Sequence, residues 1–114
     1  MSICATIGKP IYTNFDVCIH DGFVVFENLI IDKEYVYYFL EKIQDSWYKY
    51  GQPGSQVNLN SSIVANEKIS TPQIEEQQKI ASFLSGLDKK IELVDMQIQQ
   101  SKTFKKGLLQ QLFV

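Results

Sequence analysis

The residues best suited to binding chemistry lie in one polar segment, residues 49–58. It offers a lysine, a tyrosine and four amide or hydroxyl side chains: Lys49, Tyr50, Gln52, Ser55, Gln56 and Asn58. Lysines contact phosphates, amides and hydroxyls bond base edges, and tyrosines stack on bases. We therefore treat these residues, together with Lys9, as candidate DNA contacts. A plain polar surface loop has the same composition and stays as the alternative.

The charge of the chain restricts how nucleic acid could be bound. The 114 residues carry a formal net charge of −2, and all 11 basic residues are lysines. Binding through overall basicity is therefore excluded, and so is the two-pronged contact that an arginine makes with guanine or phosphate. Any DNA contact must come from a local group of lysines, amides and tyrosines.

The sequence lacks the residues needed for catalysis or for metal binding. His20 is the only histidine, and no serine or cysteine can be assigned to it as a nucleophile. Cys4 and Cys18 lack zinc-binding spacing and lie in apolar stretches, where a free cysteine is ordinarily a small buried side chain. We predict no catalytic residue, no metal site and no cofactor, with His20 at the surface.

The sequence divides near residues 71–72 into two unequal parts. The first part must position the candidate DNA contacts. Apolar residues alternate with polar or small ones in residues 3–7 and 17–19, and residues 22–26 contain a continuous apolar run. These patterns are typical of strands, and the turn chemistry of residues 20–22 favours a hairpin between the last two. A short turn is expected at residues 61–62.

A helix is predicted to follow the first strands. From Asp32 the apolar residues fall at helical spacing, with Asp32 able to cap the start and Gly51 placed to end it. Its aromatic side chains are expected to pack in the core, with Tyr48 and Tyr50 facing polar surroundings: Tyr35, Tyr37, Tyr38, Trp47, Tyr48 and Tyr50. A stacking platform for bases is the alternative role of this cluster. Strands and helix together predict a small α+β domain over residues 1–71.

The second part, residues 72–114, has the pattern of a coiled-coil helix. Its apolar residues are spaced alternately by four and three: Ile80, Leu84, Leu87, Ile91, Val94, Ile98, Leu108 and Leu112. Ser101 and Lys105 occupy the two remaining positions of this heptad seam. At 1.5 Å per residue the helix would be roughly 60 Å long, more than the first part could cover. We therefore predict that the seam is the interface with another helix.

Several stretches of the chain, in order, resemble the specificity (S) subunits of type I restriction-modification enzymes. The weaker matches are residues 5–9, 23–25, 37–40 and 54–58, and the strongest are residues 71–81 and 105–113. The resemblance covers all 114 residues but only the C-terminal part of the family's architecture, which is a partial target-recognition domain followed by one conserved spacer helix. Typical members carry two recognition domains, whose two helices pair antiparallel.

The resemblance implies a non-catalytic subunit or half-subunit that reads DNA. It implies recruitment of methyltransferase (M) and restriction (R) subunits, to which S-adenosylmethionine and ATP would belong, and a bipartite DNA target. For a chain with one helix it implies a homodimer through an antiparallel coiled coil. The alternative is an assembly protein that pairs by its helix with a specificity or modification subunit without reading DNA.

The location of the protein is predicted from what the sequence lacks. No apolar run approaches the roughly 18 to 20 residues that cross a bilayer, and no basic-then-apolar leader is present. We expect a cytoplasmic protein with no membrane partner.

Overall fold

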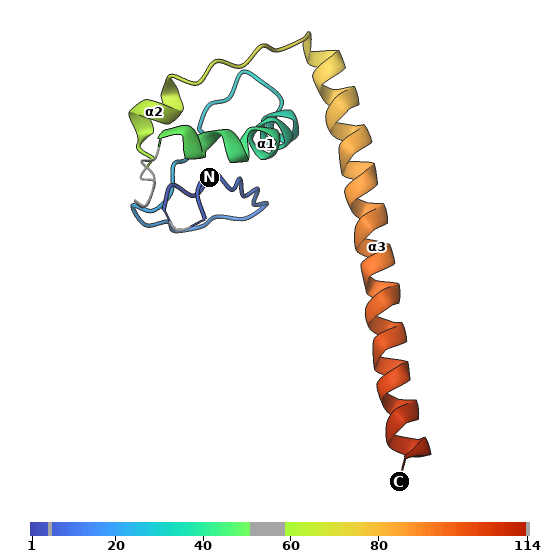
Figure 1. Ribbon diagram of the computed structural model, residues 1–114. Coiled ribbons are helices and arrows are strands. Elements are labelled where there is room, and N and C mark those ends of the chain that lie inside the picture. Colours follow the sequence, from blue (N-terminus) through green and yellow to red (C-terminus); the bar gives the residue numbers. More distant parts are fainter. Residues whose placement is uncertain (5, 51–58, 114) are drawn as a thin grey trace. The chain divides into compact units, whose positions relative to one another are not determined.

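Helices make up most of the structure, a computed structural model that describes residues 1–4, 6–50 and 59–113. In chain order they are α1 (Lys33–Lys42), the 3-10 helix η1 (Gln44–Tyr50), α2 (Ser61–Ala65) and α3 (Ile74–Leu112), as Figure 1 shows. Internal contacts divide the chain into two units, Met1–Ala81 and Ser82–Val114. Helix α3 therefore begins in the first unit and forms the second. The predicted boundary after residue 71 stays a prediction.

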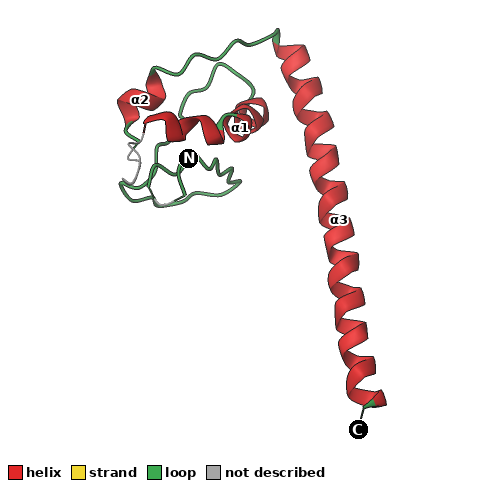
Figure 2. Ribbon diagram, in the orientation of Figure 1, coloured by secondary structure: helices red, strands yellow, loops and turns green. Residues whose placement is uncertain are grey.

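The predicted α+β class is wrong. Helix accounts for 59% of the described residues and strand for 2%, and no sheet is present among them, as Figure 2 shows. The bridge found in this part of the chain joins Ser2 to Phe23 in antiparallel fashion. Val17 and Val25, in two predicted strands, are exposed. The alternating pattern is present, but a single short pair of extended segments is only marginally stable without further strands.

The extended N-terminal segments are held by a few backbone bonds around that bridge. The amide of Ile3 donates to the carbonyl of Gly22 at 2.9 Å, and the amide of Val24 donates to the carbonyl of Met1 at 2.9 Å. The Met1 amino group in turn donates to the carbonyl of Val24, also at 2.9 Å. Burial lowers the pKa of this amino group.

The absence of a sheet also changes the state of the cysteines. Cys4 and Cys18 are free, as expected, but both are exposed rather than buried. Because no neighbouring strand covers these extended segments, their side chains reach solvent. His20 lies at the surface, as predicted, and its Nδ1 accepts a hydrogen bond from the amide of Gly22 at 2.9 Å.

Helix α1 begins where the sequence predicted and ends earlier. The side chain of Asp32 caps it by accepting a hydrogen bond from the amide of Tyr35 at 2.9 Å, and Val36 and Leu40, four residues apart, bury one face. The α-helix ends at Lys42 instead of continuing toward Gly51, because the 3-10 helix η1 follows it. Gly51 itself lies outside the described residues. At the junction between α1 and η1, the hydroxyl of Ser46 donates a hydrogen bond to the carbonyl of Ile43 at 2.6 Å.

The turn predicted at residues 61–62 is instead the start of α2. The side chain of Asn60 accepts a hydrogen bond from the amide of Ile63 at 2.9 Å, the bond of an N-terminal cap. Val64 of this short helix is buried in the core. An asparagine before two serines is a helix-start signal that the sequence interpretation missed.

The core of the first unit is built around Trp47. Its side chain is 0% exposed and clusters with six other buried residues: Met1, Ile7, Val36, Leu40, Leu59 and Val64. Of the aromatic residues predicted to pack in the core, Trp47 is buried, whereas Tyr35, Tyr37 and Tyr38 are only partly buried. Tyr48 and Tyr50 face solvent, as predicted. This core fixes the position of η1, which carries the candidate contacts Lys49 and Tyr50.

Gly8 lets the N-terminal segment approach Trp47 closely. Its φ of +73° lies in the left-handed region, and an added Cβ would be 2.9 Å from Nε1 of Trp47 and nearer still to Cδ1. We expect Gly8→Ala to lower the free energy of unfolding by about 2–4 kcal/mol, because backbone strain adds to the steric clash. Urea unfolding followed by Trp47 fluorescence measures this change.

Gly86→Ala is the matched control for that substitution. Gly86 lies in α3, and an added Cβ there meets nothing within 4 Å. It should leave stability unchanged or raise it by up to about 1 kcal/mol. Equal losses for the two variants would contradict the close contact between Gly8 and Trp47.

The start of α3 is tied to the first unit by Gln77. This side chain is only 5% exposed. Its Oε1 accepts a hydrogen bond from the amide of Asp32 at 2.9 Å, and its Nε2 donates to the carbonyl of Pro72 at 2.8 Å. Ala81, one turn later on the same side of the helix, is also buried. Gln77 thus joins the starts of α1 and α3.

Candidate functional site

Lys49, at the end of η1, is a cation that already has partners. Its Nζ lies 3.8 Å from Oε2 of Glu67 and 4.9 Å from the centre of the Tyr50 ring. The Lys49 side chain is half exposed and the Glu67 side chain is mostly covered. Lys49 could therefore contact a phosphate, but it would share its charge with Glu67. Sequence reasoning missed this pair because its members lie 18 positions apart in the chain.

Tyr50 and Gly8, the residue before Lys9, both lie against Trp47. The Tyr50 ring lies 6.1 Å from the Trp47 ring, tilted by 31°, and Gly8 packs against the same Trp47 ring. Lys9 follows Gly8 directly, and its side chain is exposed. Two candidate contacts that are far apart in the sequence thus belong to segments that pack on one buried residue. The exposed Tyr50 ring could stack on a base, and the two lysines could contact phosphates.

Four candidate contacts, Gln52, Ser55, Gln56 and Asn58, lie outside the described residues. The structure describes the residues on either side of segment 51–58, which are the exposed Tyr50 before it and the buried Leu59 after it. Their role in reading bases stays a prediction.

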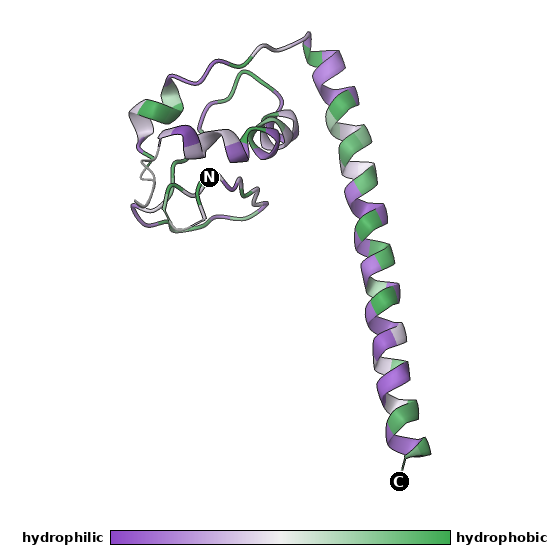
Figure 3. Cartoon of the chain, viewed as in Figure 1, coloured by the Kyte–Doolittle hydropathy of each residue, from purple (hydrophilic) through white to green (hydrophobic). Residues whose placement is uncertain are grey.

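The predicted seam follows α3 from Ile80 to Leu112. Figure 3 shows apolar residues recurring along this helix from end to end. Leu84 is partly buried, and the other apolar seam residues are exposed: Ile80, Leu87, Ile91, Val94, Ile98, Leu108 and Leu112. Ile91, for example, is 59% exposed. This face is available to a second helix, although its role as an interface stays a prediction.

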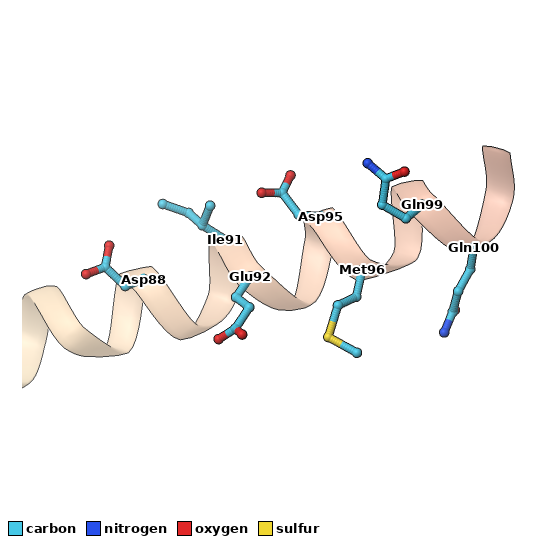
Figure 4. A pocket seen from close by; sticks show the side chains of 7 residues that line it. All are labelled: Asp88, Ile91, Glu92, Asp95, Met96, Gln99 and Gln100. Atoms are coloured by element: carbon cyan, nitrogen blue, oxygen red, sulfur yellow. The ribbon is translucent and has the colours of Figure 1, made fainter. Parts of the chain in front are cut away.

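Polar side chains flank the seam in the middle of α3. In Figure 4, Ile91 lies on the same side as Asp88 and Asp95, while Glu92 and Met96 point to the opposite side of the helix. The hollow that these residues border lies on the surface of a single helix. Such a surface cannot enclose a small ligand, so it is better suited to packing against another chain.

Two kinds of site are absent from the part of the chain that the structure describes. No group of three His, Cys, Asp or Glu side chains there is arranged to hold a metal ion. Over residues 1–4, 6–50 and 59–113, no helix combines the length and hydropathy needed to cross a membrane.

Comparison with known proteins identifies the family. The model of the type I restriction modification DNA specificity domain matches residues 1–101, which include the core, η1 and most of the seam. The chain belongs to this family. The resemblance drawn from the sequence motifs is thereby confirmed, and so is the prediction of an accessory specificity component rather than an enzyme.

Two curated relatives of this specificity domain come from Methanocaldococcus jannaschii. The chain is 35% identical over 88 residues to the type I restriction enzyme MjaVIII specificity subunit, a match that covers 76% of this chain and 20% of the relative. It is 33% identical over 86 residues to the putative type I restriction enzyme MjaX specificity subunit, covering 73% and 20%. The chain thus spans only 20% of the length of either relative. No solved structure matches the chain.

Proposed function

We propose that this specificity domain acts as a DNA-reading subunit or half-subunit of a type I restriction-modification system in the cytoplasm. Residues 1–71 would read DNA, and residues 72–114 would serve as the spacer and pairing helix. M and R subunits, recruited by the chain, would supply the chemistry. The family membership and the names of the two relatives, both specificity subunits, support this proposal.

The observation that carries the proposal is the exposed seam of α3. A roughly 60 Å helix with an apolar face along its length is an unusually large apolar surface to leave in water. Seven of its eight apolar seam residues are exposed in the single chain. A second helix would bury them by knobs-into-holes packing. We infer that two copies pair antiparallel through this seam and hold two recognition units.

Two recognition units related by a two-fold axis would bind a bipartite target. Two-fold symmetry in a DNA-binding dimer is matched by inverted half-sites in the DNA. Each unit would use the contacts around η1, namely Lys9, Lys49, Tyr50 and the polar residues of segment 49–58.

Lys49→Ala is expected to weaken DNA binding and reduce its dependence on salt. Loss of one phosphate contact should lower the slope of log affinity against log salt by about 0.9. Fluorescence anisotropy with duplex DNA at several salt concentrations measures this slope. Lys89→Ala removes the same charge from an exposed position on α3 and should leave the slope unchanged. Equal slopes for Lys49→Ala and the unmodified chain would remove Lys49 from the DNA contacts.

The second candidate function is assembly without DNA reading. The pairing of Lys49 with Glu67 and the net charge of −2 favour it, because both weaken attraction to phosphates. If the chain reads DNA, Gln56→Ala with Asn58→Ala should cost about 1–3 kcal/mol of discrimination for each lost base contact. Methylation of the same target by the M complex carrying both alanines would favour assembly instead.

A further inference from the structure

The first unit packs against α3 through two side chains on one side of the helix. Of the residues of α3, all of which the structure describes, Gln77 and Ala81 are the buried ones. They are 5% and 2% exposed, and they lie four positions apart, on the same face of the helix. Both belong to the unit Met1–Ala81. The attachment of α3 to the core of this unit therefore depends mainly on Gln77 and Ala81.

Gln77 is a polar residue in a buried position. A buried side-chain amide is destabilising unless its polar atoms form hydrogen bonds. Both ends of the Gln77 amide do so, because Oε1 accepts from the Asp32 amide at 2.9 Å and Nε2 donates to the Pro72 carbonyl at 2.8 Å. Hydrogen bonds depend on angle as well as distance, whereas apolar contacts are not directional. Gln77 therefore restricts the orientation of the first turn of α3 more narrowly than an apolar side chain of the same length would.

The two hydrogen bonds of the Gln77 side chain have different roles. The bond to Pro72 stays local, beside the bond from the Gln77 amide to the Gln73 carbonyl at 3.0 Å. The bond from Asp32 joins residues 45 positions apart. Asp32 caps α1, and its carbonyl accepts from the amide of the core residue Val36 at 3.0 Å. The Asp32 bond thus connects the start of α3 to the core of the first unit.

Gln77 lies between the candidate DNA contacts and the pairing seam. The described contacts belong to the first unit, near Trp47, and the seam begins at Ile80, three positions after Gln77. A tilt of about 10° at Gln77 would move a point roughly 28 Å farther along the helix, near the middle of the seam, by about 5 Å. One base pair of DNA rises by about 3.4 Å. A small change in the direction of α3 would therefore change the separation of two paired recognition units by a base pair or more.

We infer that Gln77 is a positioning residue for DNA recognition. By accepting a hydrogen bond from the Asp32 amide, it fixes the first turns of α3 against the start of α1. In this way it sets the number of base pairs between the two half-sites of the target. Gln77 acts through the direction of α3 and not through contact with DNA. This inference rests on the proposed function and adds to it the residue that sets the half-site spacing.

Three substitutions separate the two hydrogen bonds of Gln77 from its packing. Gln77→Met keeps the length of the side chain and removes both bonds. Gln77→Glu keeps an oxygen that accepts from the Asp32 amide and removes the donor to the Pro72 carbonyl. Gln78→Met makes the same exchange at the neighbouring glutamine, which is exposed, and is the matched control. We expect only Gln77→Met to release the first turns of α3.

Distances between spin labels measure the position of these turns without DNA and without a second copy. Labels are attached at Lys42→Cys on α1 and Lys79→Cys on α3, two exposed positions of the first unit. Cys4 and Cys18 are free and exposed, so both are first replaced by serine. The labelled chain is diluted in excess unlabelled chain, so that only distances within one copy are measured.

The width of the distance distribution is the result that matters. We expect it to be about two-fold larger in Gln77→Met, because the directional bond to the Asp32 amide is lost. It should be unchanged in Gln77→Glu and Gln78→Met. An unchanged width in a folded Gln77→Met chain, judged by circular dichroism, would overturn the inference.

The spacing of methylated half-sites tests the consequence for recognition. The chain is produced with the M subunit that we propose it recruits, and modified bases are located by sequencing. We expect a single spacing for the unmodified chain, Gln77→Glu and Gln78→Met. Gln77→Met should methylate the same half-sites at more than one spacing. A chain that merely folds poorly loses methylation but does not change the spacing.

Each remaining outcome decides for or against Gln77. A single, unchanged spacing in Gln77→Met would overturn the inference, and so would several spacings in Gln78→Met. If Gln77→Met does not fold, Gln77→Glu carries the test, because a broadened width or several spacings there would show that the Asp32 bond does not position α3. Absence of bipartite methylation with the unmodified chain would overturn the proposed function instead, and the label distances would still test Gln77.

Discussion

Leu87→Asp combined with Ile91→Asp is expected to convert the chain from a dimer to a monomer. Both residues lie in the N-terminal half of the seam on α3, and both are exposed in the single chain. Removing a buried leucine or isoleucine costs about 2–5 kcal/mol, and each variant dimer would contain four buried carboxylates. We expect the dimer dissociation constant to rise by at least about 1,000-fold. Light scattering across a range of concentrations measures it.

A matched control uses two apolar residues outside the seam. Leu93→Asp with Met96→Asp introduces the same charges into the same turns of α3, at positions that are also exposed. Figure 4 shows Ile91 and Met96 on opposite sides of the helix. The control should keep its dimeric mass. A dimer that survives Leu87→Asp with Ile91→Asp would place the interface elsewhere.

Trp47→Ala should have the largest effect on the stability of the first unit. The side chain is 0% exposed, and Gly8 and Tyr50 both pack against it. Truncating a buried aromatic residue costs about 3–5 kcal/mol, a large share of the 5–15 kcal/mol that stabilises a typical domain. Chemical unfolding followed by circular dichroism measures this loss, since the variant lacks the only tryptophan.

Tyr48→Ala is the control for the tryptophan, because it removes a neighbouring aromatic residue that is exposed. This substitution should change the free energy of unfolding by no more than about 0.5 kcal/mol. Trp47→Phe adds a second test, because the buried indole Nε1 has no hydrogen-bond partner among the described residues. Removing that donor should offset part of the lost packing. A smaller loss for Trp47→Ala than for Tyr48→Ala would contradict the core as described.

Local signals in the sequence predicted the start of α1 and the long helix α3, but not the end of α1 or the presence of α2. The cap at Asp32, the apolar spacing of Val36 and Leu40, and the heptads after residue 72 depend on contacts between residues a few positions apart. Such patterns can be read directly from spacing. The family resemblance was also correct, because several motifs in a fixed order are more specific than any one of them.

The sheet and the surroundings of the site depend on distant contacts that spacing does not reveal. Alternation in residues 17–19 predicted a strand, but a strand also needs a neighbour to pair with. The approach of Gly8 to Trp47 and the ion pair of Lys49 with Glu67 likewise join residues far apart in the sequence. The bond from the Asp32 amide to Gln77 also joins residues far apart in the sequence.

The positions methylated when the chain is produced with the M subunit that we propose it recruits test the central claim most directly. Sequencing that detects modified bases in the DNA of cells that produce both proteins identifies the methylated target. It does so without any assumption about which residues contact the DNA. We expect one bipartite site with two identical, inverted half-sites, and its loss when Leu87→Asp and Ile91→Asp are introduced. Methylation at the same positions in cells that lack the chain would contradict its role in specificity. An asymmetric target would contradict the pairing of two copies.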